Sequence, residues 1–134
     1  MGELGGKRAL VTGGSRGIGR AVVLAFARAG ADVAFCHLDD GEAAEAVARE
    51  VAAMGRKAWH RSGDIGEMSF IKQIVGQASD ALGGIDILFN NAGSNIRKPF
   101  EEVTEADFDR VVDLHLKGMF FVAQSVYRGM LARG

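Results

Sequence analysis

Short apolar runs alternate with longer amphipathic segments along this 134-residue chain, and this alternation restricts the possible folds more than any other feature. Runs of strand length lie at residues 9–11, 33–36, 57–61 and 85–89. Segments with the apolar period of a helix lie at residues 18–27, 41–54, 66–82 and 105–131. Strands separated by helices require crossover connections, which produce a parallel sheet covered on both faces. The pattern therefore predicts a single α/β domain over residues 1–134, a doubly wound parallel sheet of four strands in the order 3-2-1-4.

Charge and composition argue against several classes of function. Lysine and arginine number 16 against 17 acidic residues, so no basic field favours nucleic acid or an anionic membrane. The single cysteine, Cys36, cannot form an intrachain disulfide, and no metal-ligand cluster accompanies it. The apolar runs are too short to cross a bilayer, and the N-terminus lacks the apolar core of a signal peptide. We therefore expect a cytoplasmic protein that binds neither nucleic acid, nor a membrane, nor a metal.

A glycine-rich loop at residues 12–19 joins the first predicted strand to the first helix. Glycine lets the backbone turn sharply and approach a pyrophosphate, while the free N–H groups and positive dipole end of the helix attract its charge. A tight turn without a ligand is the alternative, but a strand before and a helix after form the context that a dinucleotide site requires. Residues 90–93 follow the fourth strand, so both loops meet where the sheet order reverses, which is where such sheets bind ligands.

Three motifs, taken together, resemble the classical short-chain dehydrogenases/reductases, which have a Rossmann-like fold. They are Thr-Gly-x-x-x-Gly-x-Gly at residues 12–19, Asp64 after the third strand and Asn-Asn-Ala-Gly at residues 90–93, and residues 114–118 fit the family's next motif. The resemblance implies an oxidoreductase domain that binds a nicotinamide dinucleotide for hydride transfer to or from a carbonyl or alcohol.

The same resemblance implies that the chain ends before the family's fifth strand and lacks the serine, tyrosine and lysine that follow it. The single tyrosine, Tyr127, has Leu131 rather than lysine four residues later. The sequence therefore leaves open whether the chain alone is an enzyme.

The resemblance also assigns roles at the switch point of the sheet. Residues 13 and 17–19 would line the phosphates and ribose, and residues 91–93 the adenosine ribose. Asp64 would accept a hydrogen bond from the adenine amino group beside the backbone of Ile65, although a helix N-cap is an alternative for Asp64. His115 replaces the family's asparagine and is the candidate catalytic residue, with a hydrogen-bonded histidine of no catalytic role as the alternative. The predicted cofactor-binding residues are Gly13, Ser15, Arg16, Gly17, Ile18, Gly19, His37, Asp64, Ile65, Asn91, Ala92 and Gly93.

Two of these residues bear on which dinucleotide is bound. His37 ends the second strand, where NAD-specific sites carry an acidic residue for the ribose 2′-hydroxyl. Arg16 stands where NADP-dependent members of the family often have a base, and a guanidinium matches a phosphate in bidentate fashion. NADP(H) is therefore favoured over NAD(H), although Asp39 and Asp40 would repel the 2′-phosphate. The alternative for His37 is a solvated loop residue, and the alternative for Arg16 is a charge on the protein surface. His60 is interpreted as a structural or surface residue.

The sequence also predicts self-association and leaves two alternative functions open. A fourth strand at the edge of the sheet, and a last helix exposing Phe120, Phe121 and Val122, predict a homodimer through one of these surfaces. A catalytically inactive module that binds a nucleotide or a protein is one alternative. A hydrolase using Ser94 and His115 is the other, but the nearby Asp113 lies two residues from His115 and so faces another side of the helix. The substrate is not predicted.

Overall fold

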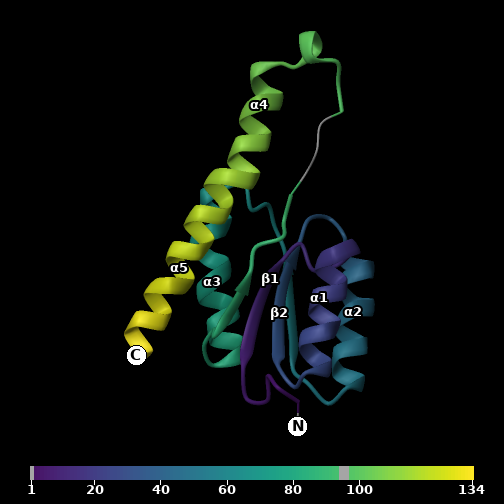
Figure 1. Ribbon diagram of the computed structural model, residues 1–134, viewed down its shortest axis with the longest axis vertical. Helices are drawn as coiled ribbons and strands as arrows, with labels where there is room; N and C mark the ends of the chain where they lie inside the picture. Colours follow the sequence, from purple (N-terminus) through teal and green to yellow (C-terminus); the bar gives the residue numbers. More distant parts are fainter. Residues whose placement is uncertain (1, 94–96) are drawn as a thin grey trace.

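The computed structural model describes residues 2–93 and 97–134 and has a four-stranded parallel sheet at its centre (Figure 1). The strands are β1 (Arg8–Thr12), β2 (Asp32–His37), β3 (Ala58–Ser62) and β4 (Ile87–Phe89). The helices are α1 (Gly17–Arg28), α2 (Gly41–Ala53), α3 (Met68–Leu82), α4 (Glu105–Val112) and α5 (Met119–Arg133), with a 3-10 turn η1 (Phe100–Glu102) and a π-helical segment η2 (Asp113–Gly118). The observed order, β3-β2-β1-β4, confirms the predicted doubly wound sheet.

The central strand β1 shows why the sheet is covered on both faces. Leu10 and Val11 are both fully buried, yet they belong to different cores because successive side chains of a strand point to opposite faces. Leu10 packs with residues of α3 and α5, whereas Val11 packs with residues of α1 and α2. Figure 1 shows these two helix layers on either side of the sheet. The continuous apolar runs in the sequence are therefore those of strands buried on both faces.

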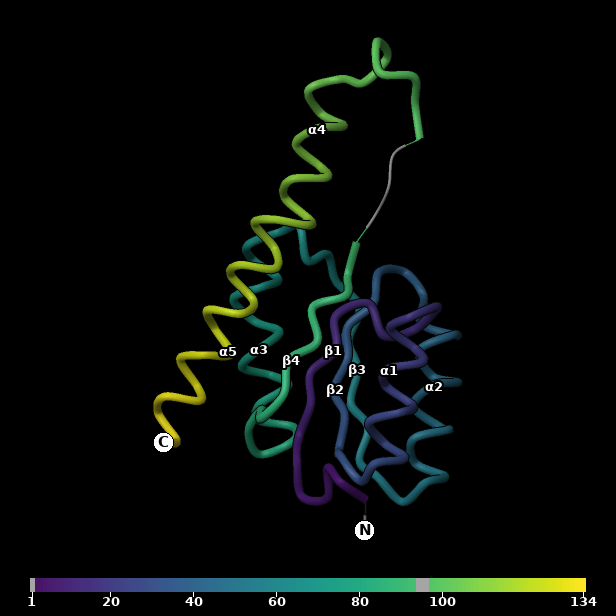
Figure 2. The backbone as a smooth tube through the Cα atoms, in the orientation of Figure 1, coloured from purple at the N-terminus to yellow at the C-terminus, as the bar shows by residue number. Residues whose placement is uncertain are grey.

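The C-terminal helical segments differ from the single helix predicted over residues 105–131. Segments α4, η2 and α5 follow one another; α4 extends past the carboxyl edge of the sheet, whereas α5 runs back beside α3 (Figure 2). At the end of the π-helical segment, a Cβ on Gly118 would lie 2.8 Å from the carbonyl oxygen of Ile65. Glycine at this position therefore allows the helix backbone to approach the loop after β3 closely.

Several local predictions were wrong for reasons of packing. Val122, expected to be exposed, is fully buried with the α3 core, whereas Phe120 is 60% exposed as expected. Ile18, expected on the apolar face of the first helix, is 70% exposed because it lies in the first turn of α1, where the helix has barely left the glycine loop. Helix α3 begins at Met68 with Glu67 as its N-cap, so Asp64 is not the N-cap.

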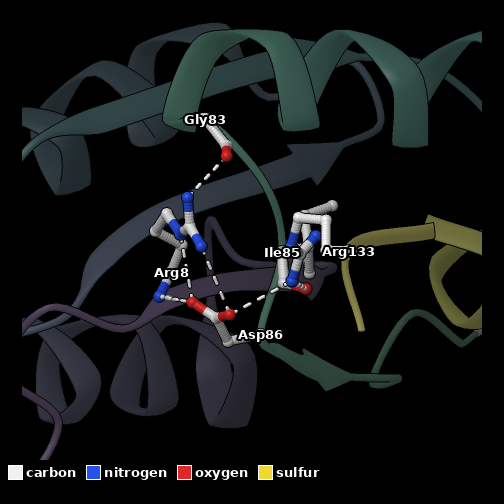
Figure 3. A network of polar contacts seen from close by, with 5 residues as sticks. All are labelled: Arg8, Gly83, Ile85, Asp86 and Arg133. Carbon is white, nitrogen blue, oxygen red and sulfur yellow. Dashed lines mark hydrogen bonds and ion pairs between the residues drawn. The ribbon is translucent and has the colours of Figure 1, made fainter. Parts of the chain in front are cut away.

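An ion-pair network joins β1, β4 and α5 at the amino edge of the sheet (Figure 3). The Asp86 carboxylate accepts hydrogen bonds from the backbone N–H and Nε of Arg8, both at 3.0 Å, and from Nη2 of Arg133 at 3.1 Å. Arg133 also donates to the carbonyl oxygen of Ile85 at 2.7 Å, and Arg8 to that of Gly83. The hydrogen bond from the Arg8 side chain is the main reason that the pKa of Asp86 is lowered. The network anchors the end of α5 to the sheet.

Within residues 2–93 and 97–134, no helix combines the length and the apolar character that a membrane span requires.

Candidate nucleotide-binding site

The loops after β1 and β4 are joined by hydrogen bonds at the carboxyl edge of the sheet. The buried hydroxyl of Thr12 accepts the backbone N–H groups of Asn91 and Ala92, each at 3.0 Å. In return, Nδ2 of Asn91 donates to the carbonyl oxygen of Gly13 at 3.1 Å. The structure thus brings together two motifs that are almost 80 residues apart, since Asn91 and Thr12 differ by 79 positions.

The glycine loop has the geometry that close approach of a phosphate requires. Gly13 and Gly17 have φ angles of +70° and +56°, in the left-handed region that favours glycine. Apart from the adjacent residues and the backbone of the same helix, no atom lies within 4 Å of the place a Cβ on Gly17 would take, so the backbone there is open. The N-cap of α1, Arg16, is extended, and its side chain does not cap the helix. The first amides of α1 therefore remain available to an anion, which is the arrangement that binds a pyrophosphate.

A hollow of about 290 Å³ lies beside this loop. It is lined by Gly13, Ser15, Cys36, His37, Leu38, Gly63, Asp64, Ile65, Ala92, Gly93, Arg110 and Leu114. Its size approaches the lower end of that of small-molecule sites, about 300 Å³, and it opens to solvent on one side. The lining residues come from the end of β2, from the loops after each of the four strands, and from α4 and η2.

The predicted site residues divide into those that line the hollow and those that surround it. Lining residues that the sequence predicted are Gly13, Ser15, His37, Asp64, Ile65, Ala92 and Gly93. The others, Arg16, Gly17, Ile18, Gly19, Asn91 and His115, are not among the lining residues. Asn91 instead holds the Gly13 carbonyl, and Gly17 to Gly19 form the first turn of α1.

Arg110 and Leu114 are the lining residues that sequence reasoning missed most clearly. Nη1 of Arg110 donates to both carboxylate oxygens of Asp64, at 2.9 and 2.7 Å, and Oδ1 of Asp64 also accepts the backbone N–H of Gly66 at 2.8 Å. The predicted adenine ligand is thus already positioned by an arginine 46 residues later. A charged residue on an amphipathic helix gives no local signal of such a partner.

Asp40 holds two of the predicted cofactor residues. Its carboxylate accepts hydrogen bonds from Nε of Arg16 at 2.6 Å, from Nη2 of Arg16 at 3.0 Å and from the hydroxyl of Ser15 at 2.8 Å. The hydrogen bond from Arg16 is the main reason that the pKa of Asp40 is lowered, and the one from Ser15 lowers it further. The Arg16 side chain is 76% exposed, so a phosphate from solvent can compete with Asp40 for its guanidinium.

His37 is not the solvated loop residue that was one alternative from the sequence. It is the last residue of β2, 5% exposed, and its Nε2 lies 3.1 Å from Nδ1 of His60 on the neighbouring strand. Burial lowers the pKa of His37, and the nearby His60 lowers it further. The His37 ring packs against the His60 ring of β3 at a centroid distance of 5.2 Å, and His37 lines the hollow.

His115 lies on the π-helical segment with its ring directly over the loop after β4. A Cβ on Gly93 would lie 2.5 Å from Cε1 of His115 and 3.2 Å from Nε2, so only glycine leaves room for the ring there. His115 therefore reaches the carboxyl edge of the sheet, as the sequence predicted, although its catalytic role stays a prediction. Ser94, the nucleophile of the hydrolase alternative, lies outside the described residues.

A helix N-terminus lined by glycines, at the switch point of a doubly wound parallel sheet, defines a Rossmann-type nucleotide-binding domain. The family model described as short chain dehydrogenase matches residues 7–134. The chain belongs to the short-chain dehydrogenase family, which confirms the resemblance found in the sequence.

Known relatives agree with this assignment. The chain is 38% identical over 125 residues to a hydroxynaphthalene reductase-like protein Arp2 of Metarhizium anisopliae, an alignment covering 93% of this chain and 47% of that protein. A short chain dehydrogenase of Burkholderia cenocepacia in complex with NADP has a TM-score of 0.92 and 37% identity, covering 94% of this chain and 51% of that one. A blue fluorescent protein from a metagenomic library, in complex with NADPH, has a TM-score of 0.89 and 38% identity, covering 93% and 51%. The chain thus spans about half the length of the relatives it matches.

Proposed function

We propose that this chain forms the NADP(H)-binding part of an oxidoreductase that reduces carbonyls or oxidises alcohols. The observation behind the proposal is the cradle at the carboxyl edge of the sheet, where the open amide end of α1 lies beside a hollow lined by Asp64 and His37. The two similar structures that contain NADP or NADPH support the choice of nucleotide. The chain spans about half the length of its relatives, so the oxidation or reduction carried out by the whole protein is also proposed here.

Each part of the site would hold one part of the dinucleotide. The amides of the first turn of α1 would bind the pyrophosphate, and the open backbone at Gly17 would let it approach. The hollow beside Asp64 would take the adenosine, and Arg16 would leave Asp40 to pair with the 2′-phosphate. The bound nicotinamide supplies or accepts the hydride. His115, whose ring packs over Gly93, is the proposed catalytic residue in this part of the molecule.

Titration of the purified chain with NADPH and NADH tests the proposal, with intact mass measured on the same sample. We expect both nucleotides to bind and NADPH to bind more tightly. Arg16→Ala should weaken NADPH by roughly tenfold and leave NADH almost unchanged, because only the charge-assisted contact to the 2′-phosphate is lost. Arg20→Ala is the matched control, since Arg20 lies on α1, four residues after Arg16, and pairs with Glu50 of α2. No affinity for either nucleotide in folded protein would overturn the proposal.

Binding without turnover over a panel of carbonyl substrates would instead favour an inactive nucleotide-binding module.

We also propose that the protein associates with a second copy of itself through α5. Phe120, Tyr127 and Leu131 are each about three-fifths exposed, at 60%, 59% and 62%, and Phe120 and Tyr127 line a shallow apolar hollow. Exposed apolar surface of this kind is typical of an interface. Sedimentation of Phe120→Ser against Phe108→Ser, which changes a phenylalanine that is 62% exposed on α4, tests this proposal. Dissociation of the first variant alone would support it, and a monomeric unmodified chain would refute it.

A further inference from the structure

Three side chains form a hydrogen-bonded chain from the nucleotide hollow to the protein surface. Nε2 of His37, at the end of β2, lies 3.1 Å from Nδ1 of His60 on β3, and Nε2 of His60 lies 2.8 Å from Oε1 of Glu45 on α2. The Phe35 ring stacks on the His60 ring with a centroid distance of 5.3 Å and an interplanar angle of 22°, which holds the ring in place. These hydrogen bonds lead from His37, which is buried and lines the hollow, to the carboxylate of Glu45, whose side chain is 60% exposed.

The order of these three groups determines which atoms hold the protons. A carboxylate can only accept hydrogen bonds, so Nε2 of His60 must donate to Glu45. In a neutral imidazole the other nitrogen is then an acceptor, so Nδ1 of His60 must receive its hydrogen bond from Nε2–H of His37. Nδ1 of His37 therefore has a lone pair and no proton. This atom is buried and has no hydrogen-bond partner among the described residues.

One added proton reverses the character of that atom. If His37 takes the proton, Nδ1 becomes a donor directly. If His60 takes it, both of its nitrogens donate, Nε2 of His37 becomes the acceptor, and the His37 proton moves to Nδ1. In both cases Nδ1 of His37 changes from an acceptor to a donor.

We propose that Glu45 and His60 set the hydrogen-bonding character of His37, and that this makes the choice between NADH and NADPH depend on pH. Without the added proton, Nδ1 of His37 accepts a hydrogen bond from the ribose 2′-hydroxyl of NADH. With it, Nδ1 donates to an oxygen of the 2′-phosphate of NADPH, which has no proton to give as a dianion. The inference rests on the proposed function, because it requires the adenosine ribose to lie beside His37 and to reach Nδ1, an atom that is buried in the free protein. Glu45 and His60 are positioning residues in it, and His37 determines specificity.

The charges around His37 decide the pH at which this change occurs. Burial and His60 lower the pKa of His37 below its ordinary value of 6.5, while Asp40 and Asp39 on the following loop oppose this shift. Arg16 neutralises part of the Asp40 charge, and across the hollow the charges of Asp64 and Arg110 are already paired with each other. His37 is consequently an acceptor at neutral pH, and its preference for phosphate develops as the pH falls below 6.5.

The protonation pattern can be tested in the free protein by NMR. Long-range proton–nitrogen correlations on histidine-labelled protein at pH 7.5 should show His37 protonated on Nε2 and bare on Nδ1. In Glu45→Gln the side-chain amide can donate as well as accept, so both tautomers of His37 should appear. Glu50→Gln on the same helix α2 is the control and should leave the pattern unchanged, because Glu50 pairs with Arg20. A proton on Nδ1 of His37 in the unmodified protein at pH 7.5 would overturn the inference.

The consequence for binding is measured as the ratio of the NADH and NADPH dissociation constants between pH 5.5 and 8.0. Coupling to one proton allows this ratio to move toward NADPH by up to about tenfold per pH unit. The slope should decrease in Glu45→Gln and persist in Glu50→Gln, whereas titration of the 2′-phosphate itself contributes equally to all three proteins. Binding of both nucleotides with equal slopes in all three would refute this inference alone. Failure of both nucleotides to bind would refute the proposed function.

Discussion

Gly19→Ala, in the first turn of α1, tests the nucleotide cradle with the smallest change of side chain. A Cβ at this position would overlap the carbonyl oxygen of Gly13 and would lie 2.6 Å from Nδ2 of Asn91. These two atoms are hydrogen-bonded to each other at 3.1 Å and belong to loops held together by Thr12. The glycine loop must therefore shift, because a main-chain carbonyl cannot move aside as the end of a flexible side chain can.

The expected cost follows from two opposing effects. Alanine in place of glycine stabilises a helix by about 0.5–1 kcal/mol, while overpacking a filled site costs about 1–3 kcal/mol. Gly19→Ala should therefore lower the free energy of unfolding by about 1–2 kcal/mol. Gly76→Ala, inside α3 with nothing within 4 Å of the added Cβ, should only gain helix stability, about 0.5–1 kcal/mol.

Urea denaturation and NADPH titration of the two variants measure these effects together. Gly19→Ala should unfold at lower urea than the unmodified chain and lose at least about tenfold in NADPH affinity, because small displacements of positioning groups have large effects on binding geometry. Gly76→Ala should unfold at higher urea and bind normally. Equal unfolding midpoints for the two variants, with equal NADPH affinity, would refute the packing described for Gly19.

Three further predictions concern charged and titratable groups. Asp86→Asn removes the carboxylate that pairs with two arginines and should lower the free energy of unfolding, measured by urea denaturation, by about 1–2 kcal/mol. Asp80→Asn, at an exposed position, is the control. Equal losses of stability in the two variants would contradict this prediction. Asp40→Asn frees the guanidinium of Arg16 and should tighten NADPH binding roughly 3–10-fold in a binding titration. Asp39→Asn should change the NADPH affinity less. Unchanged NADPH affinity in Asp40→Asn would count against a role for the Arg16 guanidinium. Because the pKa of His37 is lowered in the folded protein, the unfolded chain binds more protons below pH 6.5, so the free energy of unfolding should fall as the pH drops below that value. Denaturation curves at pH 7.5, 6.5 and 5.5 measure this decrease, which should be smaller in His37→Asn, and an equal slope in that variant would exclude His37 as its source.

The amino-acid sequence by itself determined the order of the elements and the place of the glycine loop. Buried strands and amphipathic helices have apolar periods that can be recognised within about ten residues, and crossover rules then restrict the topology to the order that the structure has. The glycines at 13 and 17 were informative for the same reason, since a left-handed backbone conformation is a local requirement of a few residues.

Only the tertiary structure decided which side chains meet. Arg110 reaches Asp64 over 46 positions, Arg16 reaches Asp40 over 24, and His37 reaches His60 over 23. Each pair depends on strand register or on where a helix packs over a loop, and neither is encoded by a short period. His60 was for this reason interpreted as structural or surface from the sequence, although it lies beside His37, which lines the nucleotide hollow.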